Sequence, residues 1–137
     1  MPQLFLERTM TINATPARVW SVLTEPEFTR RFGGEFVTEW APGSSFSWKG
    51  MDGKLYTHGV LTKIEPGVLF QYDLFHPNST SVVSTITYEL HPDETAQKTT
   101  LLAREEFAGA IAKDVYDLSG TAWVEALAKV KGYAEEK

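Results

Sequence analysis

The hydrophobic positions in the last quarter of the chain follow the period of a helix. Between residues 114 and 136, apolar side chains recur at steps of three, four and seven residues and form one stripe: Tyr116, Trp123, Leu127, Val130 and Ala134. This spacing predicts one long amphipathic helix. Such a helix needs a wide apolar surface to lie on, which the rest of the chain must provide.

The middle of the chain predicts β-strands rather than helices. Turn dipeptides such as Pro42-Gly43, Asp52-Gly53 and Pro66-Gly67 separate runs rich in β-branched and aromatic residues. We expect strands at residues 35–40, 45–49, 55–65, 68–75, 82–91 and 98–106, and a first strand at residues 3–12. The short connections favour an antiparallel meander, and the sheet would have about seven strands.

Two short helices are expected between the first strand and the meander. Thr15 followed by Pro16 is a helix start, because a hydroxyl can cap the first turn and proline is tolerated at the first helical position. A second helix at residues 27–31 would end at Gly33-Gly34. The whole pattern predicts an α+β fold in which a curved antiparallel sheet wraps around the long C-terminal helix. We expect a cavity between the sheet and that helix.

Composition narrows the possible functions. The 137 residues have the size of one domain, and we expect a single domain over residues 1–137. The formal charge of −5 opposes binding to nucleic acid, because phosphate backbones would be repelled on average. The absence of cysteine excludes disulfides, thiolate nucleophiles and cysteine-bound metals. No apolar run approaches the roughly 20 residues that span a bilayer, and an early charge argues against a signal peptide, so we expect a cytoplasmic protein.

Several aromatic residues are candidates for the wall of the cavity. Trp123 and Tyr116 lie on the apolar stripe of the helix, where they either contact a ligand or simply fill the core. Phe70 and Tyr72 alternate on the more apolar face of their strand, and we expect this face to point at the helix. Leu127 completes the apolar surface. In the last strand, the alternation leaves open whether Glu105 faces the cavity, although charged side chains are usually exposed.

His58 is the histidine that falls inside a predicted strand rather than in a turn. It could orient the polar end of a ligand, or it could be a partly buried histidine bonded to the backbone. The three histidines are dispersed, so a metal site is not expected. The chain has no nucleophile elbow, Walker loop or GxGxxG motif, and we expect no cofactor and recognise no catalytic residues.

The sequence also resembles a known family. The order of one strand, two small helices, six strands and a long helix is that of the helix-grip plan of the START-like (Bet v 1-like) superfamily. The opening carries the motif Ile12-x-Ala14-x-Pro16-x-x-Val19-Trp20-x-x-Leu23-Thr24-x-Pro26-Glu27. Further motifs follow in the family's order: Asp52-Gly53, Gly59-Val60, Ile64-Glu65-Pro66 and Trp123-x-x-x-Leu127-x-x-x-Lys131-x-Tyr133.

These motifs resemble those of bacterial SRPBCC proteins related to the heat-shock-protein-90 ATPase activator, over essentially all 137 residues. They are mostly structural and therefore indicate fold more than activity. The sequence departs from the family at Phe32, near which such proteins often carry tryptophan, and we expect this difference to alter the shape of the cavity.

We therefore expect a protein that binds a small, largely apolar or aromatic molecule in an internal cavity. The expected lining residues are Trp123, Tyr116, Leu127, Tyr72, Phe70 and His58. The wider superfamily includes polyketide cyclases, so an enzyme that works on a ligand in the cavity is the alternative. A protein-interaction role like that of the chaperone ATPase activator comes third, because the 137 residues do not include the extra domain of the eukaryotic activators.

Overall fold

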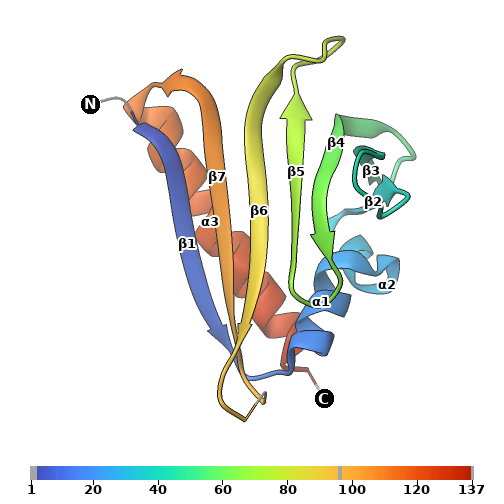
Figure 1. The fold of residues 1–137 in the computed structure, drawn as a ribbon, viewed down its shortest axis with the longest axis vertical. Coiled ribbons are helices and arrows are strands. Elements are labelled where there is room, and N and C mark those ends of the chain that lie inside the picture. Colours follow the sequence, from blue (N-terminus) through green and yellow to red (C-terminus); the bar gives the residue numbers. More distant parts are fainter. Residues whose placement is uncertain (1–2, 96, 137) are drawn as a thin grey trace.

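A computed structural model describes residues 3–95 and 97–136, without the side chains of residues 3, 4 and 110 (Figure 1). Its elements in chain order are β1 (Gln3–Ile12), α1 (Pro16–Thr24), α2 (Pro26–Thr29), the 3-10 turn η1 (Arg30–Phe32), β2 (Gly34–Thr38), β3 (Ser45–Gly50), β4 (Leu55–Glu65), β5 (Leu69–Phe75), β6 (Val82–Pro92), β7 (Thr99–Ile111) and α3 (Lys113–Ala134). The main difference from the predicted elements is β7, which continues past the expected end at residue 106 to Ile111.

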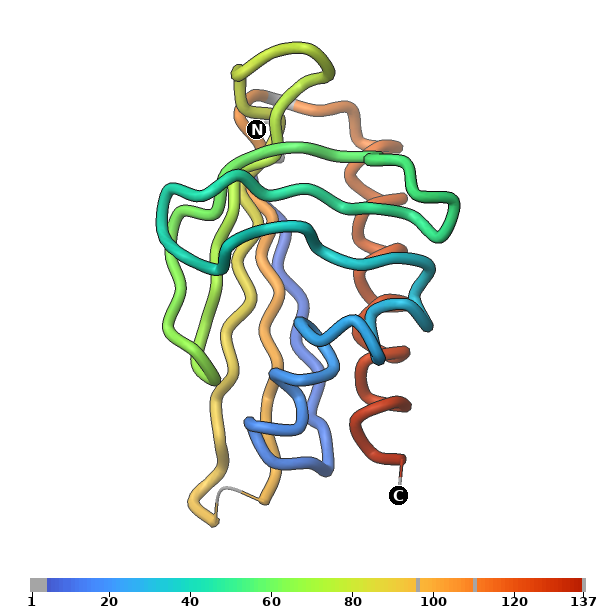
Figure 2. The backbone as a smooth tube through the Cα atoms, turned by 90° about the vertical axis from the view of Figure 1, so that its right-hand side faces the viewer, coloured from blue at the N-terminus to red at the C-terminus, as the bar shows by residue number. Residues whose placement is uncertain are grey.

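The strands form one antiparallel sheet of seven strands in the order β1-β7-β6-β5-β4-β3-β2. Strands β2 to β7 follow one another as a meander, and β1 closes the other edge by pairing with β7. In Figure 2 the strands β2 to β4 bend away from the rest of the sheet toward the side on which α3 lies. The α+β helix-grip fold predicted from the sequence is therefore confirmed.

The inner face of the sheet carries the core. Phe70 and Tyr72 of β5 are buried, as the alternation of apolar residues predicted, and Ile86 and Leu90 of β6 lie on the same side. Leu127 of α3 packs into this core. None of the helices that the structure describes combines the length and hydropathy that a bilayer crossing requires.

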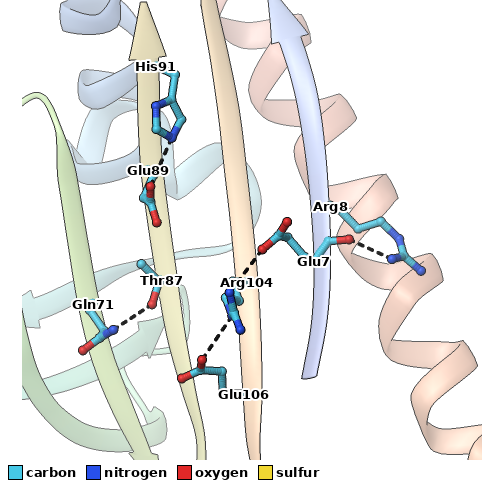
Figure 3. Close-up of polar contacts among 8 residues, drawn as sticks. All are labelled: Glu7, Arg8, Gln71, Thr87, Glu89, His91, Arg104 and Glu106. Atoms are coloured by element: carbon cyan, nitrogen blue, oxygen red, sulfur yellow. Dashed lines mark hydrogen bonds and ion pairs between the residues drawn. The ribbon is translucent and has the colours of Figure 1, made fainter. Parts of the chain in front are cut away.

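The outer face of the sheet is polar. Glu7, Arg104 and Glu106 form a row of ion pairs across β1 and β7, with nitrogen–oxygen distances of 3.5 Å and 3.1 Å (Figure 3). On the neighbouring strands the Gln71 amide donates a hydrogen bond of 2.9 Å to the Thr87 hydroxyl. These cross-strand pairs keep this face compatible with water, so no second layer is needed to cover it.

Candidate functional site

A cavity of about 120 Å³, partly open to solvent, lies between the two short helices, the sheet and α3. Its wall contains Val22, Leu23, Thr29, Phe32, Phe36, Trp48, Tyr88, Ala126 and Val130. Side-chain polar atoms in this wall belong only to Thr29, Trp48 and Tyr88, and no side chain in it is ionised at neutral pH. The cavity is therefore suited to an uncharged, mostly apolar molecule.

The segment from α1 to η1 provides four of the nine wall residues. Its local sequence fixes where α1 begins and where η1 ends. The Thr15 hydroxyl accepts a hydrogen bond of 3.3 Å from the backbone N–H of Arg18, which fixes the start of α1. At the other end Gly33 has φ of 107°, a conformation that favours glycine, and the chain turns there into β2. Val22 and Leu23 then face inward, and Phe32 follows at the rim.

Aromatic rings surround the strand side of the cavity. Phe36 lies edge-on to Trp48 at 4.9 Å between ring centroids, and both line the cavity. Behind them the rings of Phe46 and Tyr72 stack at 4.1 Å. Edge-on and stacked aromatic contacts of this kind are favourable, so the strand side of the wall should be rigid.

Four of the six site residues predicted from the sequence lie beside this wall rather than in it. Phe70 and Tyr72 are buried in the layer behind Phe36, at 6.2 Å from its ring centroid, and Leu127 is part of the core beside the cavity. Trp123 is half-buried and contacts the wall residue Tyr88 edge-on at 5.6 Å. Four of the predicted residues are thus brought together near the cavity.

Tyr116 lies away from that group, near the start of α3. Its nearest aromatic neighbour is Phe107 of β7, at a centroid distance of 6.4 Å. The helical stripe placed Tyr116 correctly on the side of α3 that turns toward the sheet. The cavity, however, lies nearer to the C-terminal half of the helix, where Ala126 and Val130 are found.

His58 lies on the outer side of the sheet. Gly59 and Leu61 of β4 are buried on the inner side, so the alternation of the strand turns His58 outward. There its Nε2 is 2.9 Å from the backbone oxygen of His76, and its ring meets Phe75 edge-on at 5.6 Å. His58 contributes to an open surface hollow beside the β5–β6 turn and is not among the residues of the internal cavity wall.

A polar network on the inner face was not expected from the sequence. The Trp123 indole N–H donates a hydrogen bond of 3.0 Å to Glu105 Oε1, and the buried Ser84 hydroxyl donates one of 2.9 Å to Oε2. Leu101 and Ala103 are buried on the same side of β7, so the structure settles the direction that the alternation had left open. Glu105 points inward, against the usual exposure of charged residues, because both of its oxygens find donors there.

Two tyrosines next to this network are held in the neutral form. Burial raises the pKa of Tyr88, and the negative charge of Glu105 raises it further. Burial also raises the pKa of Tyr72, with smaller contributions from Tyr88 and Glu105. Both phenols therefore keep their protons at neutral pH and can donate hydrogen bonds inside the protein.

Thr29 is a polar wall residue whose hydroxyl is buried without a partner. It is 2% exposed, and its Oγ1 has no hydrogen-bond partner among the residues that the structure describes. No local pattern predicted this burial, because threonine is a mostly exposed residue type. Phe32, the position at which the sequence departs from the family, is also in the wall.

Comparisons with solved structures confirm the fold. CalU16 from Micromonospora echinospora superimposes with a TM-score of 0.75 at 17% identity, covering 96% of this chain and 76% of CalU16. DynU16, a protein of the dynemicin biosynthetic locus, gives 0.80 at 17% identity, covering 98% of this chain but 48% of DynU16. The Aha1 dimer from Colwellia psychrerythraea gives 0.78 at 16% identity, with 97% of each chain covered.

Sequence comparison gives the family. No curated protein matches the chain significantly. Residues 13–135, which include both short helices, six strands of the meander and α3, match the family described as Activator of Hsp90 ATPase homolog 1-like protein. The chain belongs to this family.

Proposed function

We propose that this protein binds a small, largely apolar molecule in the internal cavity between the short helices, the sheet and α3. The observation that carries the proposal is the cavity wall itself, which is aromatic and aliphatic and has no ionised side chain. The polar network around Glu105 lies behind the wall residue Tyr88. It would hold Trp123 and Tyr88 in fixed positions as the ligand enters.

The related structures support a ligand of this kind. DynU16 shares the fold and comes from the dynemicin biosynthetic locus, which fits a protein that handles small organic molecules. The family name instead refers to activation of a chaperone ATPase, so the choice between a ligand and a protein partner must be tested on this chain.

A titration followed by NMR of the indole N–H groups tests the proposal. The compounds would be lipids, flavonoids and aromatic polyketides. Trp48 is in the cavity wall, while Trp40 packs against the core on Phe46 and is not in the wall. Saturable shifts of the Trp48 resonance that exceed those of Trp40 are expected with at least one class of compound. Equal shifts at both residues, or none, would contradict ligand binding in the cavity and point to a surface function.

A second candidate function is catalysis on the bound molecule, and Glu105 is the observation that favours it. A carboxylate on the inner face, held by Trp123 and Ser84 next to the wall residue Tyr88, would act on a bound molecule through the Tyr88 hydroxyl, because Glu105 itself is not in the wall. If the protein is an enzyme, Glu105→Gln should abolish turnover of a bound compound while changing its dissociation constant little. If Glu105 is structural, the same variant should leave any turnover within a few-fold of the original.

A further inference from the structure

Tyr88 is the wall residue whose hydroxyl a ligand in the cavity can reach. Thr29 Oγ1 is sealed from solvent, so a ligand does not contact it. Tyr88 lies on β6 between Ile86 and Leu90, which are buried on the same inner face, and its own side chain is only partly buried. The open part of Tyr88 therefore faces the cavity whose wall it forms.

The tip of the Tyr88 side chain is the part that stays open. Phe70 covers the ring at 5.0 Å between centroids, and Trp123 contacts it edge-on at 5.6 Å. The phenol oxygen at the tip is thus the polar atom that Tyr88 presents to a ligand. The third polar wall residue, Trp48, is turned toward β2, where its indole nitrogen lies 2.8 Å from the place that a Cβ at Gly34 would take.

The hydrogen bonds around Tyr88 leave its proton free. Burial and the charge of Glu105 raise the pKa of Tyr88, and a hydrogen bond with Tyr72 lowers it somewhat. Burial raises the pKa of Tyr72 most, and the same hydrogen bond raises it a little further. Since donating a hydrogen bond favours the protonated form, Tyr72 is the donor and the Tyr88 oxygen is the acceptor. The O–H of Tyr88 has no acceptor within the described residues 3–95 and 97–136, because the Glu105 oxygens accept from Trp123 and Ser84 instead.

We propose that the Tyr88 hydroxyl donates a hydrogen bond to a neutral carbonyl oxygen of the bound molecule, so that the cavity takes ring-sized ketones and similar carbonyl compounds. A carbonyl oxygen only accepts, and it therefore matches a free O–H. Carboxylates also accept, but they are excluded because the wall has no cationic side chain and Glu105 places a negative charge behind Tyr88. This inference rests on the proposed function, since it requires a ligand in the same cavity.

The test compares cyclohexanone with methylenecyclohexane, which has a CH₂ group in place of the carbonyl oxygen. Both rings suit a cavity of about 120 Å³, since an engineered apolar cavity of about 150 Å³ in another protein takes up benzene. Dissociation constants would be measured from the Trp48 indole shift, in the original protein and in Tyr88→Phe, which keeps the ring and removes the hydroxyl. We expect the variant to weaken cyclohexanone binding about fivefold and to leave methylenecyclohexane binding unchanged, as one lost hydrogen bond implies.

Tyr72→Phe is the matched control. Tyr72 is hydrogen-bonded to Tyr88 but is not in the cavity wall, and its substitution leaves the Tyr88 O–H in place. The ratio of the two dissociation constants should stay within about twofold of its original value. A changed ratio in Tyr72→Phe with an unchanged ratio in Tyr88→Phe would assign the donor to Tyr72 and overturn the proposal.

An infrared spectrum of the bound ketone gives an answer that needs no variant. In the original protein the C=O stretch of bound cyclohexanone should lie below its value in dry cyclohexane, because an accepted hydrogen bond weakens the double bond. In Tyr88→Phe the stretch should move back toward the cyclohexane value. A bound stretch at the cyclohexane value in the original protein would overturn the role of Tyr88.

The possible results separate the two proposals. If both compounds bind but Tyr88→Phe leaves their ratio unchanged, the role of Tyr88 is overturned while ligand binding in the cavity stands. If neither compound, nor any member of the wider panel, shifts Trp48, both proposals are overturned.

Discussion

At the scale of single residues, Glu105 differs from the other carboxylates described here, because it points to the inner face of the sheet and accepts two hydrogen bonds. Removing its side chain would leave the partly buried Trp123 N–H and the buried Ser84 hydroxyl without this acceptor. We expect Glu105→Ala to lower the free energy of unfolding by about 2 kcal/mol, measured by urea denaturation. The Trp123 indole resonance should move in the same variant.

Its neighbour in sequence provides the control. Glu106 points to the outer face, where it pairs with Arg104 at 3.1 Å in an exposed position (Figure 3). Glu106→Ala should cost about 0.5 kcal/mol or less, since exposed ion pairs contribute little. Equal losses in the two variants would show that the inner network does not stabilise the protein.

Gly59 is a second residue whose role depends on one close contact. A Cβ atom added at this position would overlap the backbone oxygen of Asp73 on β5, which cannot move without breaking the sheet. We expect Gly59→Ala to lower the free energy of unfolding by about 3 kcal/mol, as overpacking does in a well-packed core. Gly109→Ala in β7 is the control, because an added Cβ meets no atom within 4 Å there, and a similar loss in both variants would refute the explanation.

At the scale of elements, two arginines of the short helices, Arg18 and Arg31, form hydrogen bonds with the C-terminal end of α3. Arg31 forms two hydrogen bonds with the Glu136 carboxylate, at 3.0 Å and 2.6 Å, and its guanidinium lies 3.9 Å from the ring centroid of Tyr133. Arg18 of α1 donates to the backbone oxygens of Tyr133 and Ala134, each at 3.3 Å. This end of α3 lies close to the cavity, so fastening it should also keep the wall closed.

These contacts predict a pH dependence. The hydrogen bonds from Arg31 lower the pKa of Glu136 below its ordinary value, and the hydrogen bond from Lys131 lowers that of Glu135. A lowered pKa in the folded state means that the stabilisation is present above the unfolded pKa and disappears as pH falls through the folded pKa. Between about pH 5 and 3 we expect the backbone ¹³C shifts of residues 131–135 to lose helical character before those of residues 118–128.

Glu136→Gln tests the assignment of this effect. The variant removes the titrating group, so a large part of the change between those pH values should already be present at neutral pH. If the last turn of α3 remains helical at pH 3 in the original protein, the charged contacts do not hold it in place.

At the scale of the whole molecule, the cavity exists because elements far apart in sequence leave a space that none of them fills. Ala126 is the smallest side chain in the wall, and Ala126→Leu should occupy part of the space from the side of α3. We expect this variant to weaken binding of any cavity ligand at least tenfold, measured by the Trp48 shift, while the thermal midpoint stays the same or rises. Ala128→Leu on the exposed side of the same helix should leave binding unchanged.

A fall in thermal midpoint with Ala126→Leu, together with unchanged binding, would show that the helix shifts outward and that the cavity adapts to new side chains. That result would also contradict a rigid, size-selective wall.

The predictability of the site differed from that of the fold for physical reasons. Periods of two and 3.6 residues report which side of a strand or helix is buried, and they placed Phe70, Tyr72 and Leu127 in the interior. These periods do not show which of the buried residues line a cavity. The wall includes Thr29, Phe32 and Trp48, which come from three different elements and which no local pattern connects.

Local sequence patterns were enough to predict the order of the elements, the antiparallel meander and the amphipathic α3, because turn residues and hydrophobic periods act over a few positions. Motifs that resemble those of its members indicated the family. The inward direction of Glu105 and the outward direction of His58 depend on the tertiary structure, since pairing with neighbouring strands fixes the face of each residue. The tertiary structure alone also decided the cavity wall. Side chains that are far apart in the chain line this cavity together. Their distances depend on how the sheet bends and how α1 and α2 pack against it, and no local pattern encodes those distances.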